Sequence, residues 1–131
     1  MNFIDTIIKN KTTCFFISPH LDDAVLSCGE LLSQLKKNKN STVINVFTKA
    51  HEGPYTLSAR KFLFDSQKYI SAKTLFKKRA QEDNKALTTL GVKIINLGFT
   101  DALFRKKEKT RMLGRILPEF AHVYPLYRWH V

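Results

Sequence analysis

The sequence predicts an α/β protein, with a Rossmann-like parallel sheet that is flanked by helices and incomplete at its C-terminal end. The alternation of two kinds of segment predicts this class. Short apolar segments of strand character alternate with longer segments in which apolar residues recur at helical spacing. The chain has 131 residues, 44% of them hydrophobic, which suits a single domain that we expect to cover residues 1–131.

The first part of the chain predicts a strand, a helix and a second strand. Residues 13–18 (TCFFIS) are short and apolar, as in a strand buried on both faces. Residues 42–48 (TVINVFT) are β-branched and apolar, which is also typical of a strand. The segment between them, residues 24–37, predicts a helix because apolar residues recur at helical spacing, namely Val25, Leu31, Leu32 and Leu35.

A loop and the most regular helix of the sequence follow. Residues 49–72 contain Gly53 and Pro54 and have no clear period, so we expect a long loop that could hold one helical turn. Helical periodicity returns in residues 73–90, and Gly91 marks the end of that helix.

The last part of the chain predicts a third strand and a weaker helix. Residues 92–97 (VKIINL) have strand character, and residues 110–120 predict a helix that ends near Pro118. The chain then ends inside an apolar and aromatic, strand-like segment, which suggests truncation. A sheet without its last strands exposes an edge, so we expect possible self-association through that edge.

Charge and composition disfavour several classes of protein. The net charge is +11, but the basic residues form short groups in loops or at predicted helix ends, which favours a solvated surface over a nucleic-acid groove. No apolar run approaches the roughly 20 residues of a membrane span, and the start lacks a secretory signal, so we expect a cytoplasmic protein. Cys14 and Cys28 belong to no CxxC pair, and we expect buried thiols.

Residues that can carry chemistry follow the first predicted strand, in the stretch Pro19-His20-Leu21-Asp22-Asp23. Ligands of open α/β sheets collect at the carboxyl ends of strands, where this stretch lies. His20 and Asp23 could face one metal ion, and nitrogen with oxygen ligands suits zinc. Asp22 would point elsewhere and could deprotonate a metal-bound water. Simpler roles stay open: either aspartate could cap the following helix, and His20 could be a hydrogen-bonded turn residue.

This stretch, followed by Leu26, Ser27 and Gly29, resembles the PHxDD signature of the PIG-L/LmbE-like family of zinc-dependent N-deacetylases. Residues 48–53 (TKAHEG) are a looser match to that family's loop after the second strand. Two later blocks are similar to further characteristic blocks of the family: Arg79-x-x-Glu82-x-x-x-Ala86-x-x-x-Leu90-Gly91 and Leu97-Gly98-Phe99-Thr100-Asp101-Ala102. The resemblance covers residues 13–105 in the right order.

The resemblance implies a set of site residues. It implies that His20 and Asp23 bind Zn²⁺, and that Asp22 is the general base on the metal-bound water and later returns a proton to the departing amine. Arg79 aligns with a substrate-contacting arginine of the family. The alternative is that Arg79 pairs with Glu82 or Glu52 and only shapes the wall of the pocket.

The chain departs from the family at its C-terminus. The family takes its third zinc ligand from the second histidine of an HxDH motif, and the first histidine is thought to stabilise the oxyanion. A loose alignment makes His130 that first, catalytic histidine, and the ligand would then fall beyond Val131. His130 or His122 could substitute as the ligand, or the remainder could be encoded separately, and His51 could line the pocket. Two ligands alone would hold zinc weakly.

The leading hypothesis is a zinc-dependent hydrolase that removes an acetyl group from an N-acetylated amino sugar, such as N-acetylglucosamine, or from a related conjugate. Its partner would be a small molecule, with neither nucleic acid nor a membrane span involved. The alternative is a catalytically inactive remnant of the same fold that binds a sugar or a protein. A nucleic-acid-binding module ranks below both. A nucleotide cofactor is disfavoured because the turn holds two carboxylates where a glycine-rich loop would be needed.

Overall fold

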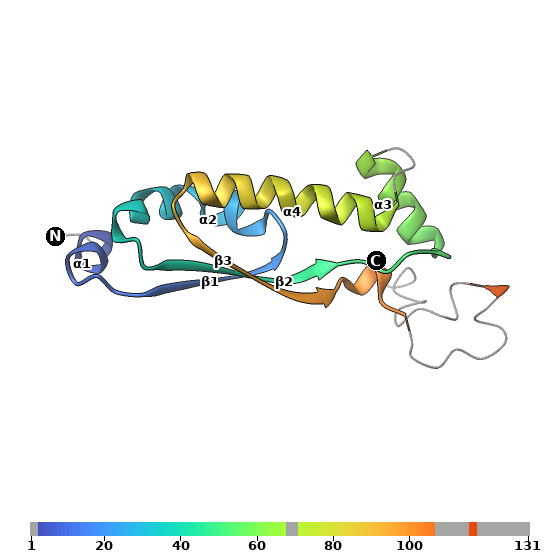
Figure 1. The fold of residues 1–131 in the computed structure, drawn as a ribbon, viewed down its shortest axis with the longest axis horizontal. Helices are drawn as coiled ribbons and strands as arrows, with labels where there is room; N and C mark the ends of the chain where they lie inside the picture. Colours follow the sequence, from blue (N-terminus) through green and yellow to red (C-terminus); the bar gives the residue numbers. More distant parts are fainter. Residues whose placement is uncertain (1–2, 68–70, 107–115, 118–131) are drawn as a thin grey trace. The chain divides into compact units, whose positions relative to one another are not determined.

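The computed structural model describes residues 3–67, 71–106 and 116–117 (Figure 1). Their elements are α1 (Phe3–Lys9), β1 (Cys14–His20), α2 (Asp23–Gln34), β2 (Ser41–Lys49), α3 (Leu57–Gln67), α4 (Ala72–Thr89) and β3 (Lys93–Thr100), with short 3₁₀ helices at Leu35–Asn38 and Ala102–Phe104. The chain divides into two compact units. The first unit comprises residues 1–48 and 78–99, and the second comprises residues 49–77 and 100–131.

The three strands form one sheet in the order β1-β2-β3. β1 and β2 are parallel, with Phe16 opposite Val43 and His20 opposite Phe47. All three strands run in the same direction (Figure 1). Parallel strands need a crossover between them, and helices supply it here, which is why strands and helices alternate along the chain. The predicted α/β class with a parallel sheet is confirmed.

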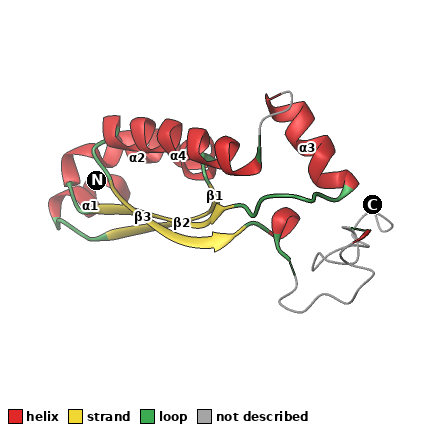
Figure 2. Ribbon diagram, turned by 45° about the vertical axis from the view of Figure 1, so that its right-hand side comes forward, coloured by secondary structure: helices red, strands yellow, loops and turns green. Residues whose placement is uncertain are grey.

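Helix α2 and the part of α4 in the first unit lie on one face of the sheet (Figure 2). Each of these elements contributes to a common apolar core, and the core explains why this face is covered. Its buried members are Ala24, Leu32, Val43, Leu87 and Val92, packed against Phe16, Val25, Cys28, Leu90 and Ile94. Both cysteines are free thiols. The expectation that they are buried is wrong, because Cys14 begins a strand and Cys28 lies at the border of the core, so each is only half-buried.

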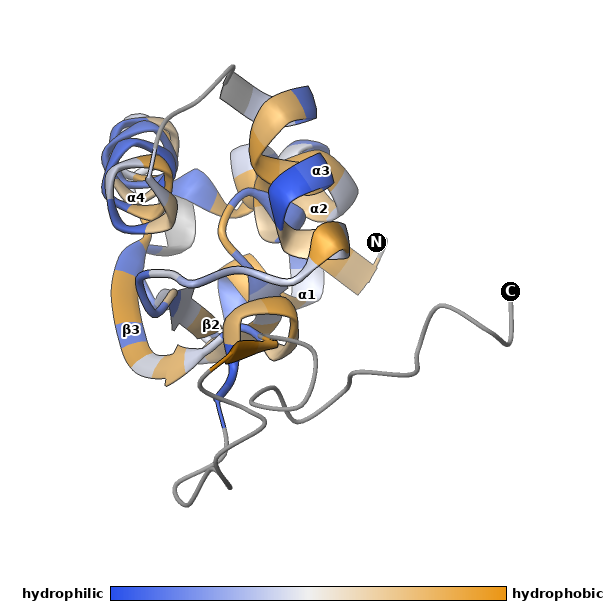
Figure 3. Cartoon of the chain, turned by 90° about the vertical axis from the view of Figure 1, so that its right-hand side faces the viewer, coloured by the Kyte–Doolittle hydropathy of each residue, from blue (hydrophilic) through white to orange (hydrophobic). Residues whose placement is uncertain are grey.

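β1 and β3 carry large apolar side chains that are exposed. Along each strand, these side chains alternate with those that pack in the core. Phe15 and Ile17 flank the core residue Phe16, and their exposed fractions are 64% and 75%. On β3, Leu97 and Phe99 are also exposed, and Figure 3 shows hydrophobic residues along much of this strand. Because successive side chains of a strand point to opposite faces, these residues lie on the face away from α2. The predicted self-association through a sheet edge stays a prediction.

The second unit contains a helix where a loop is predicted. α3 has 11 residues and begins after Thr56, whose hydroxyl accepts a hydrogen bond from the Ala59 amide at 3.2 Å. The prediction of a long loop is therefore wrong for this segment. The apolar centre of this unit is Phe104, which is 1% exposed and packs edge-on against three aromatic rings at centroid distances of 5.6 to 6.0 Å, those of Tyr55, Phe62 and Phe76.

Other predicted elements agree closely or fall outside the described residues. The predicted helix at residues 73–90 corresponds to α4, and Gly91 ends it with a φ of +72°. Apart from residues 116–117, the predicted helix at 110–120 and the strand-like end of the chain lie outside the described residues. Among the helices that the structure describes, none is long and apolar enough to cross a membrane.

Candidate active site

The stretch between β1 and α2 forms a tight turn at the carboxyl end of β1. β1 ends at His20, and α2 begins at Asp23. The Ser18 hydroxyl holds the two sides of the turn together, because it donates to the His20 carbonyl at 2.7 Å and accepts from the Ala24 amide at 3.1 Å. Ser18 thus satisfies one of the amide donors that a helix leaves unpaired at its start.

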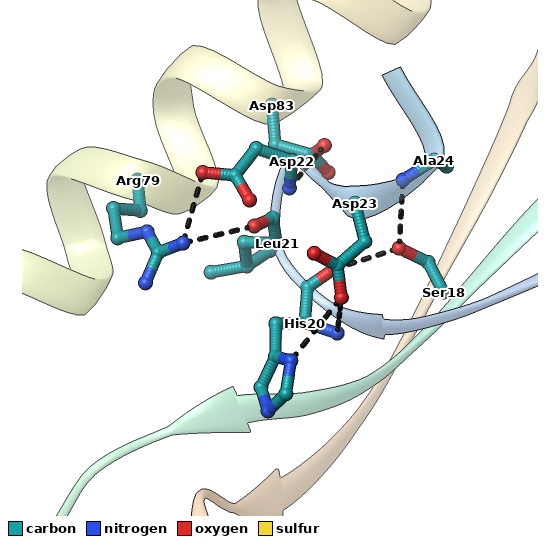
Figure 4. Close-up of polar contacts among 8 residues, drawn as sticks. All are labelled: Ser18, His20, Leu21, Asp22, Asp23, Ala24, Arg79 and Asp83. Atoms are coloured by element: carbon teal, nitrogen blue, oxygen red, sulfur yellow. Dashed lines mark hydrogen bonds and ion pairs between the residues drawn. The ribbon is translucent and has the colours of Figure 1, made fainter. Parts of the chain in front are cut away.

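His20 and Asp23 are brought together, as the sequence predicts. Asp23 Oδ2 accepts a hydrogen bond from the His20 amide at 2.9 Å and lies 3.1 Å from His20 Nδ1 (Figure 4). The two side chains are 44% and 40% exposed, so the pair is accessible from solvent. Phe47 packs on the imidazole, with a ring-centroid distance of 5.8 Å. A nitrogen and an oxygen donor thus converge at the surface, which fits two ligands of a zinc ion.

Asp22 points away from this pair, toward α4. Its Oδ2 accepts a hydrogen bond from Arg79 Nη2 at 2.8 Å, and the same Nη2 donates to the Leu21 carbonyl at 3.2 Å (Figure 4). Asp22 occupies the N-cap position of α2, but its side chain makes no capping hydrogen bond. The capping role considered for Asp22 is therefore wrong, since Ser18 performs it. Within the first unit, the ion pair of Arg79 is made with Asp22, whereas the alternative named Glu82 or Glu52 as its partner.

A buried polar layer lies beneath the turn, and the sequence analysis missed it. Asp83 of α4 accepts a hydrogen bond from the Asp22 amide at 3.1 Å, through Oδ1. Its Oδ2 accepts one from Asn45 Nδ2 of β2 at 2.7 Å. Asn45 is fully buried and Asp83 is 3% exposed. A polar residue inside the apolar segment 42–48, and the one-turn spacing of Arg79 and Asp83, are the sequence signals that could have revealed this layer.

The metal ligands stay predictions, the third one included. Among residues 3–67, 71–106 and 116–117, no group of three or more histidine, cysteine or acidic side chains could hold a metal ion. His51 belongs to the second unit and is exposed. His122 and His130, the candidates from the C-terminal segment, lie outside the described residues. Of the predicted ligands, the described part of the chain contains His20 and Asp23, which lie side by side.

Comparison with known proteins identifies the family. Residues 15–129 match the family of GlcNAc-PI de-N-acetylases, PIG-L. The chain therefore belongs to the PIG-L family, and the resemblance inferred from the PHxDD stretch is confirmed.

Relatives and solved structures with similar sequences are deacetylases. The 2′-N-acetylparomamine deacetylase of Niallia circulans is 31% identical over an alignment of length 113 that covers 76% of this chain and 40% of that protein. The zinc-inhibited form of teicoplanin deacetylase is 35% identical with a TM-score of 0.64, over 74% of this chain and 36% of that one. A40926 pseudoaglycone deacetylase is 34% identical with a TM-score of 0.60, over 72% of this chain and 39% of that one. The chain thus spans about 40% of the length of these relatives.

Proposed function

We propose that the chain acts as a zinc-dependent N-deacetylase on an acetylated amino sugar within a conjugate. The observation that carries this proposal is the divergence of two adjacent carboxylates. Asp23 turns to His20, and Asp22 turns to Arg79. One carboxylate can therefore bind a metal while its neighbour handles a proton, which is the division of roles that metal-assisted amide hydrolysis needs.

His20 and Asp23 would hold the Zn²⁺ ion through the imidazole and a carboxylate oxygen. When bound, zinc supplies a Lewis acid that polarises an acetamide carbonyl and lowers the pKa of water. Asp22 is 45% exposed, and with Oδ2 on Arg79 its Oδ1 would take the proton of the attacking water and later deliver it to the departing amine. A catalytic role of His130 at the oxyanion, and a substrate contact of Arg79, belong to the same proposal.

The names of the relatives support the substrate class. Two of them are named for N-acetylparomamine and for teicoplanin, so we take an N-acetylated amino sugar in a larger conjugate as the substrate here. Zinc is associated with one of these proteins by its zinc-inhibited form. The alternative of an inactive binding module has less support, because these relatives are all named as deacetylases.

The experiment measures zinc content by elemental analysis and acetate release from N-acetylglucosamine conjugates, with zinc added at no more than one equivalent. We expect His20→Ala and Asp23→Ala to lose zinc. Asp22→Asn should keep zinc and lose activity by a factor of about 10² to 10⁴. Asp65→Ala, an exposed aspartate of α3, is the matched control and should change neither. Equal zinc content in all variants, or a zinc-loaded protein that releases no acetate, would contradict the proposal.

A further inference from the structure

The buried layer under the turn has an unusual composition for the inside of an α/β unit. The Asp83 side chain lies between α4 and the sheet at 3% exposure, and a carboxylate there is costly unless its oxygens are hydrogen-bonded. Both oxygens have a donor: the Asp22 amide contacts Oδ1, and Asn45 Nδ2 contacts Oδ2. Neither donor is a charged group, so the layer is not a buried ion pair.

Asn45 is oriented by its acceptors. Its amide nitrogen donates to Asp83 Oδ2 at 2.7 Å and to Asn96 Oδ1 at 2.9 Å. Among the described residues, its own Oδ1 has no hydrogen-bond partner. Reversing the amide would place that oxygen against two acceptors, so Asn45 keeps this orientation even though one of its atoms stays unsatisfied. Asn45, which lies on β2, thereby fixes the position of the Asp83 carboxylate through this hydrogen bond.

Asp22 has a backbone conformation that needs support. Its φ is +81°, in the left-handed region that residues with a side chain seldom adopt. Such conformations persist where surrounding contacts determine them, and they cluster at functional sites. Two residues of α4, one helical turn apart, supply these contacts: Arg79 binds the Asp22 carboxylate, and Asp83 binds the Asp22 amide (Figure 4).

We propose that Asp83, itself held by Asn45, is a positioning residue for Asp22. It fixes the Asp22 amide and so holds the Asp22 carboxylate on the Arg79 side of the turn, separate from the pair of His20 and Asp23. This inference rests on the proposed function, in which Asp22 moves the proton. Without the Asp83 acceptor the turn can relax, and displacing a catalytic group by about 1 Å can cost about 10²-fold in rate.

The first measurement does not need activity. We would follow hydrogen exchange of the Asp22 amide by NMR, with the Val43 amide of β2 as the reference for global opening. Asp83→Ala should speed exchange at Asp22 relative to Val43. Asp83→Asn keeps an oxygen acceptor and should retain most of the protection. Asn84→Ala, which changes an exposed neighbour on α4, should have no effect. Unchanged protection of Asp22 in Asp83→Ala would overturn the proposal.

The second measurement is a double-mutant cycle on kcat. Asp83→Ala should lower kcat by roughly 10- to 100-fold with little change in KM, as is typical of residues that orient an active-site group. In an Asp22→Asn background the same substitution should cost little more, because the group that it positions is already disabled. A full additional loss in that background would show a merely structural role and overturn the proposal.

Failure of the proposed function remains distinguishable from failure of this inference. If the wild-type chain releases no acetate, the deacetylase proposal fails, and the exchange of the Asp22 amide still decides whether Asp83 positions it. If Asp83→Ala does not fold, Asn45→Ala takes its place, since it removes a donor to Asp83 and should speed Asp22 exchange to a smaller degree. If the Asp22 amide exchanges at the same rate in Asn45→Ala as in Asn84→Ala, the inference is contradicted.

Discussion

Arg79 and Asp22 are 57 residues apart in sequence, yet Arg79 Nη2 lies 2.8 Å from Asp22 Oδ2. The side chains are 26% and 45% exposed, respectively. An ion pair this close to solvent contributes only about 0 to 1 kcal/mol to stability. Its larger effect is on orientation, because the guanidinium also binds the Leu21 carbonyl and so holds both the turn and the carboxylate.

Substituting Arg79 should therefore affect catalysis more than stability. Arg79→Ala should lower kcat by about 10-fold or more, because the Asp22 carboxylate is no longer held, and should change the free energy of unfolding by at most about 1 kcal/mol. Steady-state kinetics and urea unfolding measure the two quantities, with Lys77→Ala on the same helix as the control. A rise in KM with unchanged kcat would instead show that Arg79 mainly contacts substrate.

Zinc should stabilise the folded chain through His20 and Asp23. A ligand that binds only the folded state adds about 2.7 kcal/mol at a concentration 100 times its Kd, which raises the melting temperature by several degrees. A chelator should reverse the shift, and Asp23→Ala should abolish it. Differential scanning fluorimetry with graded zinc checks this prediction. If zinc raises the melting temperature of His20→Ala as much as that of the wild type, the metal binds at another site.

The sequence predicts the first unit better than the second. All three strands lie within three residues of their predicted bounds, because each is a short apolar segment next to a turn. Helix α3 is missed because Gly53 and Pro54 suggest a loop and because its residues show little periodicity. Its stability comes from tertiary contacts, such as the packing of Phe62 against Phe104, that local sequence does not reveal.

The same distinction applies to the site. His20, Asp22 and Asp23 are predictable because they are adjacent in sequence at a strand end, where the fold places ligands. The partner of Asp22 and the roles of Asn45 and Asp83 depend on contacts between residues 38 to 61 positions apart. Local patterns can mark Asn45, Arg79 and Asp83 as unusual residues, but they do not say which residues these side chains contact. The contacts follow only once β2 and α4 are placed beside the turn.

Gly91, just past the end of α4, should tolerate substitution poorly. Its φ is +72°, and the Gly91 and Val92 amides donate to the carbonyls of Thr88 and Leu87, which closes the end of the helix. Gly91→Ala should destabilise the chain by about 1 kcal/mol, through the left-handed backbone. Crowding contributes little, because an added Cβ would lie an ordinary 3.5 Å from Lys36 Cγ.

A second glycine provides a control, because its substitution by alanine should raise the stability of the chain rather than lower it. Gly29 lies inside α2, and an added Cβ there would have no atom within 4 Å. Gly29→Ala should stabilise the chain by roughly 0.5 to 1 kcal/mol, because alanine favours the helix. Urea unfolding of both variants measures the pair. Equal changes in the free energy of unfolding would contradict the prediction. They would show that the positive φ at position 91 does not require glycine there.

Tyr55 should make the stability of the chain fall at alkaline pH. Burial raises the pKa of the Tyr55 phenol above its ordinary value of 10.0, and the hydrogen bond that it donates to Glu52 adds to this. The phenol also accepts a hydrogen bond from the Ala72 amide at 3.1 Å. Because the folded state holds the proton more tightly than the unfolded state, this contribution is complete below pH 10 and is lost as the pH rises through the raised pKa.

The free energy of unfolding, measured from pH 8 to 11.5, tests whether stability falls with rising pH as predicted. The wild type should lose stability above about pH 10 more steeply than Tyr55→Phe, which has no phenolic proton to release. Lysines also titrate in this range, but they are common to both proteins, so the difference between the two curves isolates Tyr55. Parallel curves would mean that the phenol has the same proton affinity in the folded and unfolded states, and would contradict the raised pKa of Tyr55.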